Sequence, residues 1–264
     1  MLWCGAARVL VRPRSIFARS LSSSASYVEL PQAWAATYEA SSQEELLVAY
    51  RSWAPTYDTD SIGLFGYRAP ARTAEVLSEK LEKALGADSS KGAKILDVGA
   101  GTGLVGERLV ELGHDAASLA AADLSPDMLE VARRKGCYLG GLFLCDLEDE
   151  DAAAEALGHS TFEAAVAVGT FTPNHAGTKS LDAMVRAVQP GGLLCFSLRD
   201  DFQANPSNGF QHYLDALVTT GVLEKVGETS PELYTPKVSE DISFRVWTYA
   251  VGASGIRGDW KGCS

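Results

Sequence analysis

Residues in the middle of the chain have the types and spacing needed to bind a nucleotide cofactor. An apolar run over 94–98 contains Asp97, and three glycines follow at alternate positions, namely Gly99, Gly101 and Gly103. Glycine has no Cβ, so such a turn lets a ligand approach the main chain closely. The helix expected next would point its N-terminal amides at that ligand. Asp123 ends the following apolar run, where its carboxylate can accept hydrogen bonds from ribose hydroxyls.

The glycine spacing fits two classes of cofactor. Residues 101–106 satisfy the dinucleotide pattern G-x-G-x-x-G, and residues 97–103 satisfy the tighter pattern D-x-G-x-G-x-G. Asp97 would stand near the pyrophosphate of a dinucleotide and repel it, whereas it suits a cofactor whose near end is cationic. The amino group and sulfonium of S-adenosylmethionine are such groups. The motif therefore favours a methyl donor, with a dinucleotide and a ligand-free glycine turn as the alternatives.

The chain resembles the class I S-adenosylmethionine-dependent methyltransferases. The stretches that carry this resemblance occur in the family's order and are residues 95–103, 122–129, 144–148 and 189–194. A narrower likeness, to the methyltransferase-like proteins named after the Williams-Beuren syndrome region, is carried by residues 50–58, 168–175 and 245–249. The resemblance implies methyl transfer from S-adenosylmethionine by direct displacement, and we expect a small-molecule acceptor.

Cofactor-binding residues follow from the resemblance and from the rule that ligands of open parallel sheets lie outside the carboxyl ends of the strands. We expect the methionine end of the donor at the loop formed by Asp97, Gly99, Ala100, Gly101 and Gly103. Asp123 would bind the ribose, and Asp146 corresponds to the family position that accepts from the adenine amino group. The adenine ring would lie between Leu124 and Leu147.

The segment 168–175 follows the fourth expected strand, where the methyl group should meet its acceptor. Direct displacement needs donor and acceptor in line at ~3 Å, so positioning supplies much of the rate. His175 has an ordinary pKa of ~6.5, which suits a general base. We therefore predict that His175 is a catalytic base or orients the substrate; the alternative is a loop histidine with a structural hydrogen bond.

An aromatic group precedes the cofactor motif and consists of Tyr50, Trp53, Tyr57 and Tyr67. We predict that Tyr57 and Tyr67 line a lid over the sulfonium, whose charge an aromatic face attracts. The helical spacing of Tyr50 and Trp53 is more typical of core residues. Asp200 and Asp201, after the fifth expected strand, either face the substrate or form a solvated turn.

The predicted fold is an α/β, Rossmann-like, doubly wound sheet of seven strands, mostly parallel, with helices on both faces and a helical lid at the N-terminus. Five parallel strands are expected at 94–98, 118–123, 141–145, 163–168 and 192–198, and an antiparallel hairpin at 221–226 and 242–251. Helices are expected over 43–53, 72–85 and 208–219, and a linker over 87–92. A loop should begin at Tyr57.

Composition limits the partners. The net charge is −11, and residues 1–25 hold four arginines and no acid, so the rest of the chain carries −15. Such a surface repels phosphate backbones, so a nucleic-acid substrate is not expected. The five cysteines form no C-x-x-C pair, so neither a metal site nor a disulfide framework is expected. No apolar run reaches the ~18 residues that a membrane span requires.

Four segments are expected along the chain. Residues 1–25 have the Arg- and Ser-rich composition of a transit peptide, which predicts the mitochondrial matrix, with a plastid or the cytoplasm as alternatives. Residues 26–90 would form a helical cap, 91–252 the methyltransferase domain and 253–264 a C-terminal tail. A non-catalytic donor-binding assembly factor and an NAD(P)-dependent oxidoreductase are the rival functions.

Overall fold

The computed structural model describes residues 30–172 and 175–253. The predicted transit peptide, residues 1–25, and nearly all of the predicted tail, residues 254–264, lie outside the described residues.

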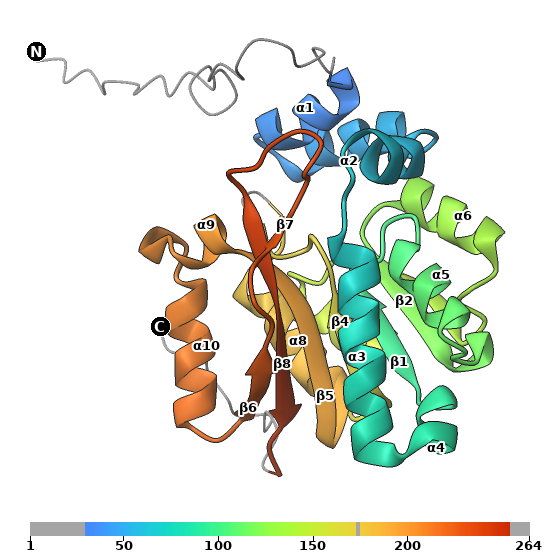
Figure 1. Ribbon diagram of the computed structural model, residues 1–264, viewed down its shortest axis with the longest axis vertical. Helices are drawn as coiled ribbons and strands as arrows, with labels where there is room; N and C mark the ends of the chain where they lie inside the picture. The colour runs from blue at the N-terminus through green and yellow to red at the C-terminus, as the bar shows by residue number, and fades with distance from the viewer. Residues whose placement is uncertain (1–29, 173–174, 254–264) are drawn as a thin grey trace, which may run out of the picture.

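A single mixed sheet forms the centre of the molecule (Figure 1). The strand order is β3-β2-β1-β4-β5-β8-β6, and the short β7 pairs with β8. The first five strands run parallel and β8 runs antiparallel to β5 and β6. Their bounds are β1 Ile95–Val98, β2 Leu119–Asp123, β3 Gly141–Leu144, β4 Phe162–Ala167, β5 Val188–Arg199, β6 Leu223–Glu228, β7 Glu232–Leu233 and β8 Ser243–Val251. The predicted fold class is confirmed, and β7 adds an eighth short strand.

Helices cover both faces of the sheet because successive strand residues point to opposite sides. Leu96 packs in one apolar cluster with α7, α8 and α10, and Ile95 packs in the other with α3, α5 and α6. The bounds are α3 Ala69–Leu85, α5 Leu104–Glu111, α6 Pro126–Lys135, α7 Glu150–Leu157, α8 Thr178–Ala187 and α10 Phe210–Thr219. Burial of both faces explains the continuous apolar strands in the sequence.

The smaller elements lie between these helices and strands. They are α4 Ala87–Lys91, η3 Ala116–Ser118, α9 Asp200–Gln203 and η4 Pro206–Asn208. The linker predicted over 87–92 is wrong, since α4 occupies most of it. The predicted helix over 72–85 begins earlier, at Ala69, because Pro70 is favourable in a first helical turn.

Three further elements cover the carboxyl ends of the parallel strands: α1 Gln32–Glu39, α2 Gln43–Trp53 and the π-helical segment η2 Thr59–Leu64 (Figure 1). We call residues 32–64 the cap. The helix predicted over 43–53 is confirmed, and the Ser42 hydroxyl caps it by accepting from the Glu45 amide at 3.2 Å. The cap is shorter than the predicted segment 26–90, because α3 packs on the sheet.

The predicted loop at Tyr57 is instead helical and leads into η2. Asp60 explains the difference, because its carboxylate accepts from the Trp53 indole at 2.9 Å and from the Thr56 hydroxyl at 2.8 Å. Its carbonyl accepts from the Phe65 amide, which is the i→i+5 bond of a π-helix. Pro55 therefore ends the regular α-helix without ending the helical turn.

A buried carboxylate supports the glycine-rich turn from behind. Asp97 is 1% exposed and accepts a short hydrogen bond from the Tyr138 hydroxyl, which in turn accepts from the Gly106 amide at 3.0 Å. A Cβ on Gly106 would lie 2.3 Å from the Tyr138 ring. The second Asp97 oxygen, Oδ1, has no hydrogen-bond partner in the described part of the chain. Burial raises the pKa of Asp97 to about 7, although the Tyr138 bond opposes the shift.

This raised pKa predicts a pH-dependent cost of folding. The folded protein holds the Asp97 proton up to a pH of about 7, whereas the unfolded chain releases it near 3.8, so the contribution of this group to stability falls as pH rises between these values. Asp97→Asn removes the effect. We expect the unfolding free energy of the variant, relative to wild type, to increase by about 2 kcal/mol between roughly pH 5.5 and 8 in urea titrations.

Asp88→Asn, at an exposed position on α4, is the matched control and should follow the wild-type pH profile. Parallel profiles for wild type and Asp97→Asn would show that Asp97 is ionised throughout this range in the folded protein.

Candidate functional site

A crevice of about 250 Å³ lies between the cap and the loops that follow β1, β2, β3 and β4. β1 and β4 are neighbours whose connections leave in opposite directions, which is where open α/β sheets bind ligands. Most of the predicted site residues line this crevice, namely Tyr57, Gly99, Gly101, Asp123, Leu124, Asp146, Leu147 and His175. The remaining three, Asp97, Ala100 and Gly103, do not. The rule about strand ends thus located the crevice.

The three exceptions support the turn. The Asp97 carboxylate is 1% exposed and accepts a hydrogen bond from the Tyr138 hydroxyl. The Ala100 amide donates to the Ala122 carbonyl at 3.1 Å, which ties the turn to β2. Gly103 caps α5 in the left-handed conformation, with φ of 87°. These contacts give the three residues a role in positioning the turn, and their direct contact with the cofactor stays a prediction.

Gly99 and Gly101 need to be glycine for different reasons. A Cβ on Gly99 would lie 2.5 Å from the Thr170 hydroxyl, so this residue lets the loops after β1 and β4 touch. Gly101 has φ of 55° and open space where a Cβ would be. Because it also lines the crevice, a ligand can approach its backbone closely.

The Asp123 carboxylate is held in place by the turn itself. It accepts from the Gly101 amide at 2.7 Å and from the Ser125 amide at 2.8 Å. Burial raises the pKa of Asp123, and these backbone donors oppose the rise. Ser125 caps α6 through the Met128 amide, as its position before Pro126 predicts, so Asp123 is not needed as the helix cap. A carboxylate has about four acceptor positions, which leaves Asp123 able to accept from a ribose hydroxyl.

Asp146 connects the cap to the far end of the crevice. One of its oxygens accepts from the Glu148 amide at 2.9 Å, and the other accepts from the Gln43 side-chain amide at 2.7 Å. Gln43 is the first residue of α2, so the cap reaches across the place predicted for adenine. Sequence reasoning missed Gln43, because a polar first residue of a helix carries no signal of a ligand contact.

Glu148 is a second residue that the sequence did not reveal. Its carboxylate accepts from the Gly177 amide at 2.8 Å and from the amide and hydroxyl of Ser180 at 3.2 and 2.6 Å. A carboxylate is favourable at the positive N-terminus of a helix such as α8. Glu148 therefore holds the segment that leads from His175 into α8. Its position two residues after Asp146 was the available signal.

His175 contacts the cap directly. Its Nε2 lies 2.6 Å from the Tyr50 hydroxyl, and the two rings meet edge to face at 5.8 Å. Burial raises the pKa of Tyr50 well above its usual value, so this hydroxyl stays protonated at neutral pH. A neutral hydroxyl can donate to Nε2 or accept from it. Tyr50, expected to be a core residue, thus also belongs to the site.

Asp58 fixes the cap beside the glycine-rich turn. It accepts from the Thr102 hydroxyl at 2.5 Å and pairs with the Lys135 ammonium at 2.6 Å. Because Asp58 adjoins Tyr57, these contacts set where the Tyr57 ring enters the crevice.

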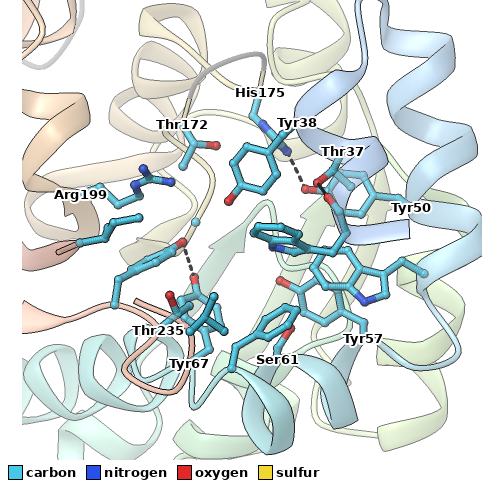
Figure 2. Close-up of a pocket in the computed structure, with 17 residues that line it drawn as sticks. Thr37, Tyr38, Tyr50, Tyr57, Ser61, Tyr67, Thr172, His175, Arg199 and Thr235 are labelled. Carbon is cyan, nitrogen blue, oxygen red and sulfur yellow. Dashed lines mark hydrogen bonds between the residues drawn. The ribbon is translucent and has the colours of Figure 1, made fainter. Parts of the chain in front are cut away.

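A smaller cavity of about 70 Å³ adjoins the crevice (Figure 2). The two share four lining residues, namely Tyr50, Tyr57, Gly169 and His175. Tyr67, predicted with Tyr57 as part of the lid, lines only this smaller cavity, where its hydroxyl accepts from that of Tyr234 at 3.2 Å. In Figure 2, Arg199 lies on one side of the cavity, and Tyr50 and Tyr57 lie on the other.

The end of β5 contributes a cation to the smaller cavity. Arg199 donates to both oxygens of Asp201, at 2.9 and 2.5 Å. Its side chain is 12% exposed and its guanidinium lies 5.7 Å from the Tyr234 ring centre. Asp200 instead accepts from Ser243 and Arg245 of β8. Of the two acids predicted to face substrate or solvent, neither lines the cavity, and Asp201 holds Arg199, which the sequence did not single out.

Residues 30–172 and 175–253 contain no membrane-spanning helix. They also contain no cluster of three or more His, Cys, Asp or Glu side chains that could hold a metal ion.

Comparisons with known proteins agree with this geometry. Residues 95–192 match the family model for a methyltransferase domain, and residues 54–135 match that for lysine methyltransferases. Similar curated proteins include a ubiquinone biosynthesis O-methyltransferase of Xanthomonas oryzae pv. oryzae, 35% identical over 107 residues, which are 40% of this chain and 43% of the relative. Another from Xanthomonas axonopodis pv. citri is 33% identical over 124 residues, 47% of each chain.

The chain thus spans less than half the length of these curated relatives. Among solved structures, a TehB-like methyltransferase from Corynebacterium glutamicum superimposes with a TM-score of 0.50 at 20% identity, over 77% of this chain and 98% of that one, which shows the shared fold. The glycine-rich turn, the carboxylate after β2 and the matched family model lead to one assignment. Residues 95–192 match a methyltransferase domain, and the sheet around them has the fold of a known methyltransferase.

Proposed function

We propose that this protein transfers a methyl group from S-adenosylmethionine to a small-molecule acceptor. The observation that carries the proposal is the Asp123 carboxylate, held by the Gly101 amide at 2.7 Å at the edge of the crevice. Open space beside Gly101 and free acceptor positions on Asp123 suit the nucleoside part of the donor. The second Asp97 oxygen, which is buried without a partner among the described residues, leaves an acceptor position behind the turn.

When bound, S-adenosylmethionine would supply an electrophilic methyl group, whose bond to sulfur breaks as the acceptor's electron pair forms the new bond, with S-adenosylhomocysteine as the leaving group. The residues of this chain bind, orient and shield. Asp123 would hold the ribose, and Asp146 would accept from the adenine amino group after exchanging Gln43 for it. Leu124 and Leu147 would supply the apolar walls.

His175 is the residue proposed to take the proton of the acceptor. It lines both cavities, so its ring borders the place where acceptor and methyl group meet. The protonated Tyr50 hydroxyl at Nε2 keeps the ring oriented. The relatives named above are O-methyltransferases, which favours an oxygen acceptor and a base. A lysine acceptor, suggested by the second family model, would bring an ammonium to a cavity that no described Asp or Glu lines.

The narrower likeness and the location also stand as proposals. Residues 50–58 and 168–175, which carry the resemblance to the Williams-Beuren methyltransferase-like proteins, contain Tyr50, Tyr57 and His175 of the site. The composition of residues 1–25 supports import into the mitochondrial matrix. Fusion of these residues to a fluorescent protein tests the location, and a cytoplasmic signal would count against it.

The cofactor assignment predicts selective binding of S-adenosylhomocysteine. Calorimetric titration of the full chain should give a Kd in the micromolar range, about −8 kcal/mol, and no heat with NAD or NADP. Asp123→Ala should lower the affinity for S-adenosylhomocysteine at least tenfold, because it removes the ribose acceptor and the partner of the Gly101 amide. Asp88→Asn should bind like wild type. Binding of NADP in preference to S-adenosylhomocysteine would identify the protein as the rival oxidoreductase.

The base assignment predicts a loss of turnover rather than of binding. Once an acceptor is identified, His175→Ala should lower kcat by about 10²-fold or more, because general-base catalysis contributes that much. Its affinity for S-adenosylhomocysteine should stay within a few-fold. His159→Ala, at an exposed position, should leave kcat unchanged. Donor binding without turnover by any acceptor of a broad metabolite panel would instead support the non-catalytic assembly factor.

A further inference from the structure

We propose that the smaller cavity selects an acceptor in which a single aromatic ring carries an acidic group, with the acid placed against Arg199. This inference rests on the proposed function, since it names the acceptor of the same site. It assigns Arg199 as the residue that determines charge specificity.

The walls of the cavity suit a flat apolar body. The rings of Trp53 and Tyr57 pack 4.5 Å apart, and those of Tyr67 and Tyr234 pack edge to face at 4.8 Å. Burial raises the pKa of the tyrosines at 57, 67 and 234, so their hydroxyls are neutral. Aromatic side chains pair well with another ring through offset or edge contacts. The walls therefore favour an aromatic acceptor over an aliphatic one.

The charges favour an acid over an amine. Among the described residues that line the cavity, Arg199 carries a permanent positive charge. None of them is an Asp or a Glu. Ring faces can attract a cation, but the Arg199 guanidinium already lies over Tyr234 at 5.7 Å. An ammonium in this cavity would meet a positive charge and no carboxylate. An acid group would gain a charge-assisted hydrogen bond.

Arg199 keeps donors for such a group. A guanidinium has five N–H groups; Asp201 receives two of them, and the Tyr38 hydroxyl is also hydrogen-bonded to the guanidinium. The two side chains also differ in exposure, because that of Arg199 is 12% exposed and that of Asp201 is 58% exposed. Asp201 thus holds the guanidinium from the solvent side and partly offsets its charge. Removal of Asp201 should therefore increase the affinity of the cavity for an anion. If the ion pair only held Arg199 in place, its removal would lower that affinity.

The size of the cavity places the ring. Its volume of about 70 Å³ is roughly half that of a cavity known to hold benzene, ~150 Å³. A ring with its acid at Arg199 would therefore extend across the boundary formed by Tyr50, Tyr57 and His175 into the crevice. The edge of the ring opposite the acid would face His175 and the methyl group.

Three phenols of similar size test the inference by calorimetry on the full chain saturated with S-adenosylhomocysteine: 4-hydroxyphenylacetate, 4-ethylphenol and tyramine. We expect the acid to bind at least about tenfold more tightly than the neutral phenol, and tyramine to bind most weakly. Arg199→Gln should remove the advantage of the acid and leave 4-ethylphenol within about twofold. Asp201→Asn should increase the affinity for 4-hydroxyphenylacetate about threefold.

The matched control is Arg186→Gln on α8, which is ion-paired with Glu150 and lies outside both cavities. It should bind all three phenols like wild type.

The affinity for S-adenosylhomocysteine reports whether each variant is folded. If Arg199→Gln no longer binds it, the result for Asp201→Asn decides the question alone. Equal binding of the three phenols, a preference for tyramine, or weaker acid binding by Asp201→Asn overturns the inference and leaves the proposed function intact. Failure of S-adenosylhomocysteine to bind wild type overturns the proposed function and the inference with it.

Discussion

The contact between Gly99 and Thr170 is the constraint on which the site depends. It brings the loop after β1 against the loop after β4, with no room for a Cβ between them, and the Thr170 hydroxyl adds a bond to the Val98 carbonyl at 2.9 Å. These two loops leave the sheet at the point where its connections diverge. One carries the turn expected to bind the donor, and the other carries His175. Their contact therefore sets the distance between the turn and His175.

The glycine-rich turn is held from two further sides. Asp123 accepts from its Gly101 amide at the crevice, and the Asp97–Tyr138 pair supports it from within the domain. Asp97 is buried, and one of its own oxygens has no hydrogen-bond partner among the described residues. Its burial therefore costs folding free energy. Proteins accumulate such costs at sites that bind charged groups, and a bound sulfonium would favour the ionised form. Stability and donor binding are thus linked through one carboxylate.

The cap contributes as much to the site as the sheet does. Gln43 reaches Asp146, Tyr50 reaches His175, and Asp58 reaches Thr102 and Lys135. Each contact joins a cap residue to a different loop over the strand ends. Tyr50 and Tyr57 of the cap line both the crevice and the smaller cavity. The two cavities therefore share one boundary.

The sequence alone determined the elements of the sheet, because apolar runs at regular spacing with glycine and carboxylate after them have few other structural solutions. It also placed Asp123, Asp146 and His175 at the crevice, since each lies at the carboxyl end of a parallel strand or in the loop after it. The roles of Asp97 and Arg199 were decided only by tertiary structure. Asp97 turns inward because Tyr138, 41 residues away in the chain, offers it a hydroxyl.

Arg199 enters an aromatic cavity because the cap and the connection that carries Tyr234 meet over the end of β5. Side-chain direction at a strand end depends on which distant groups occupy the neighbouring space. No local pattern of residues contains that information.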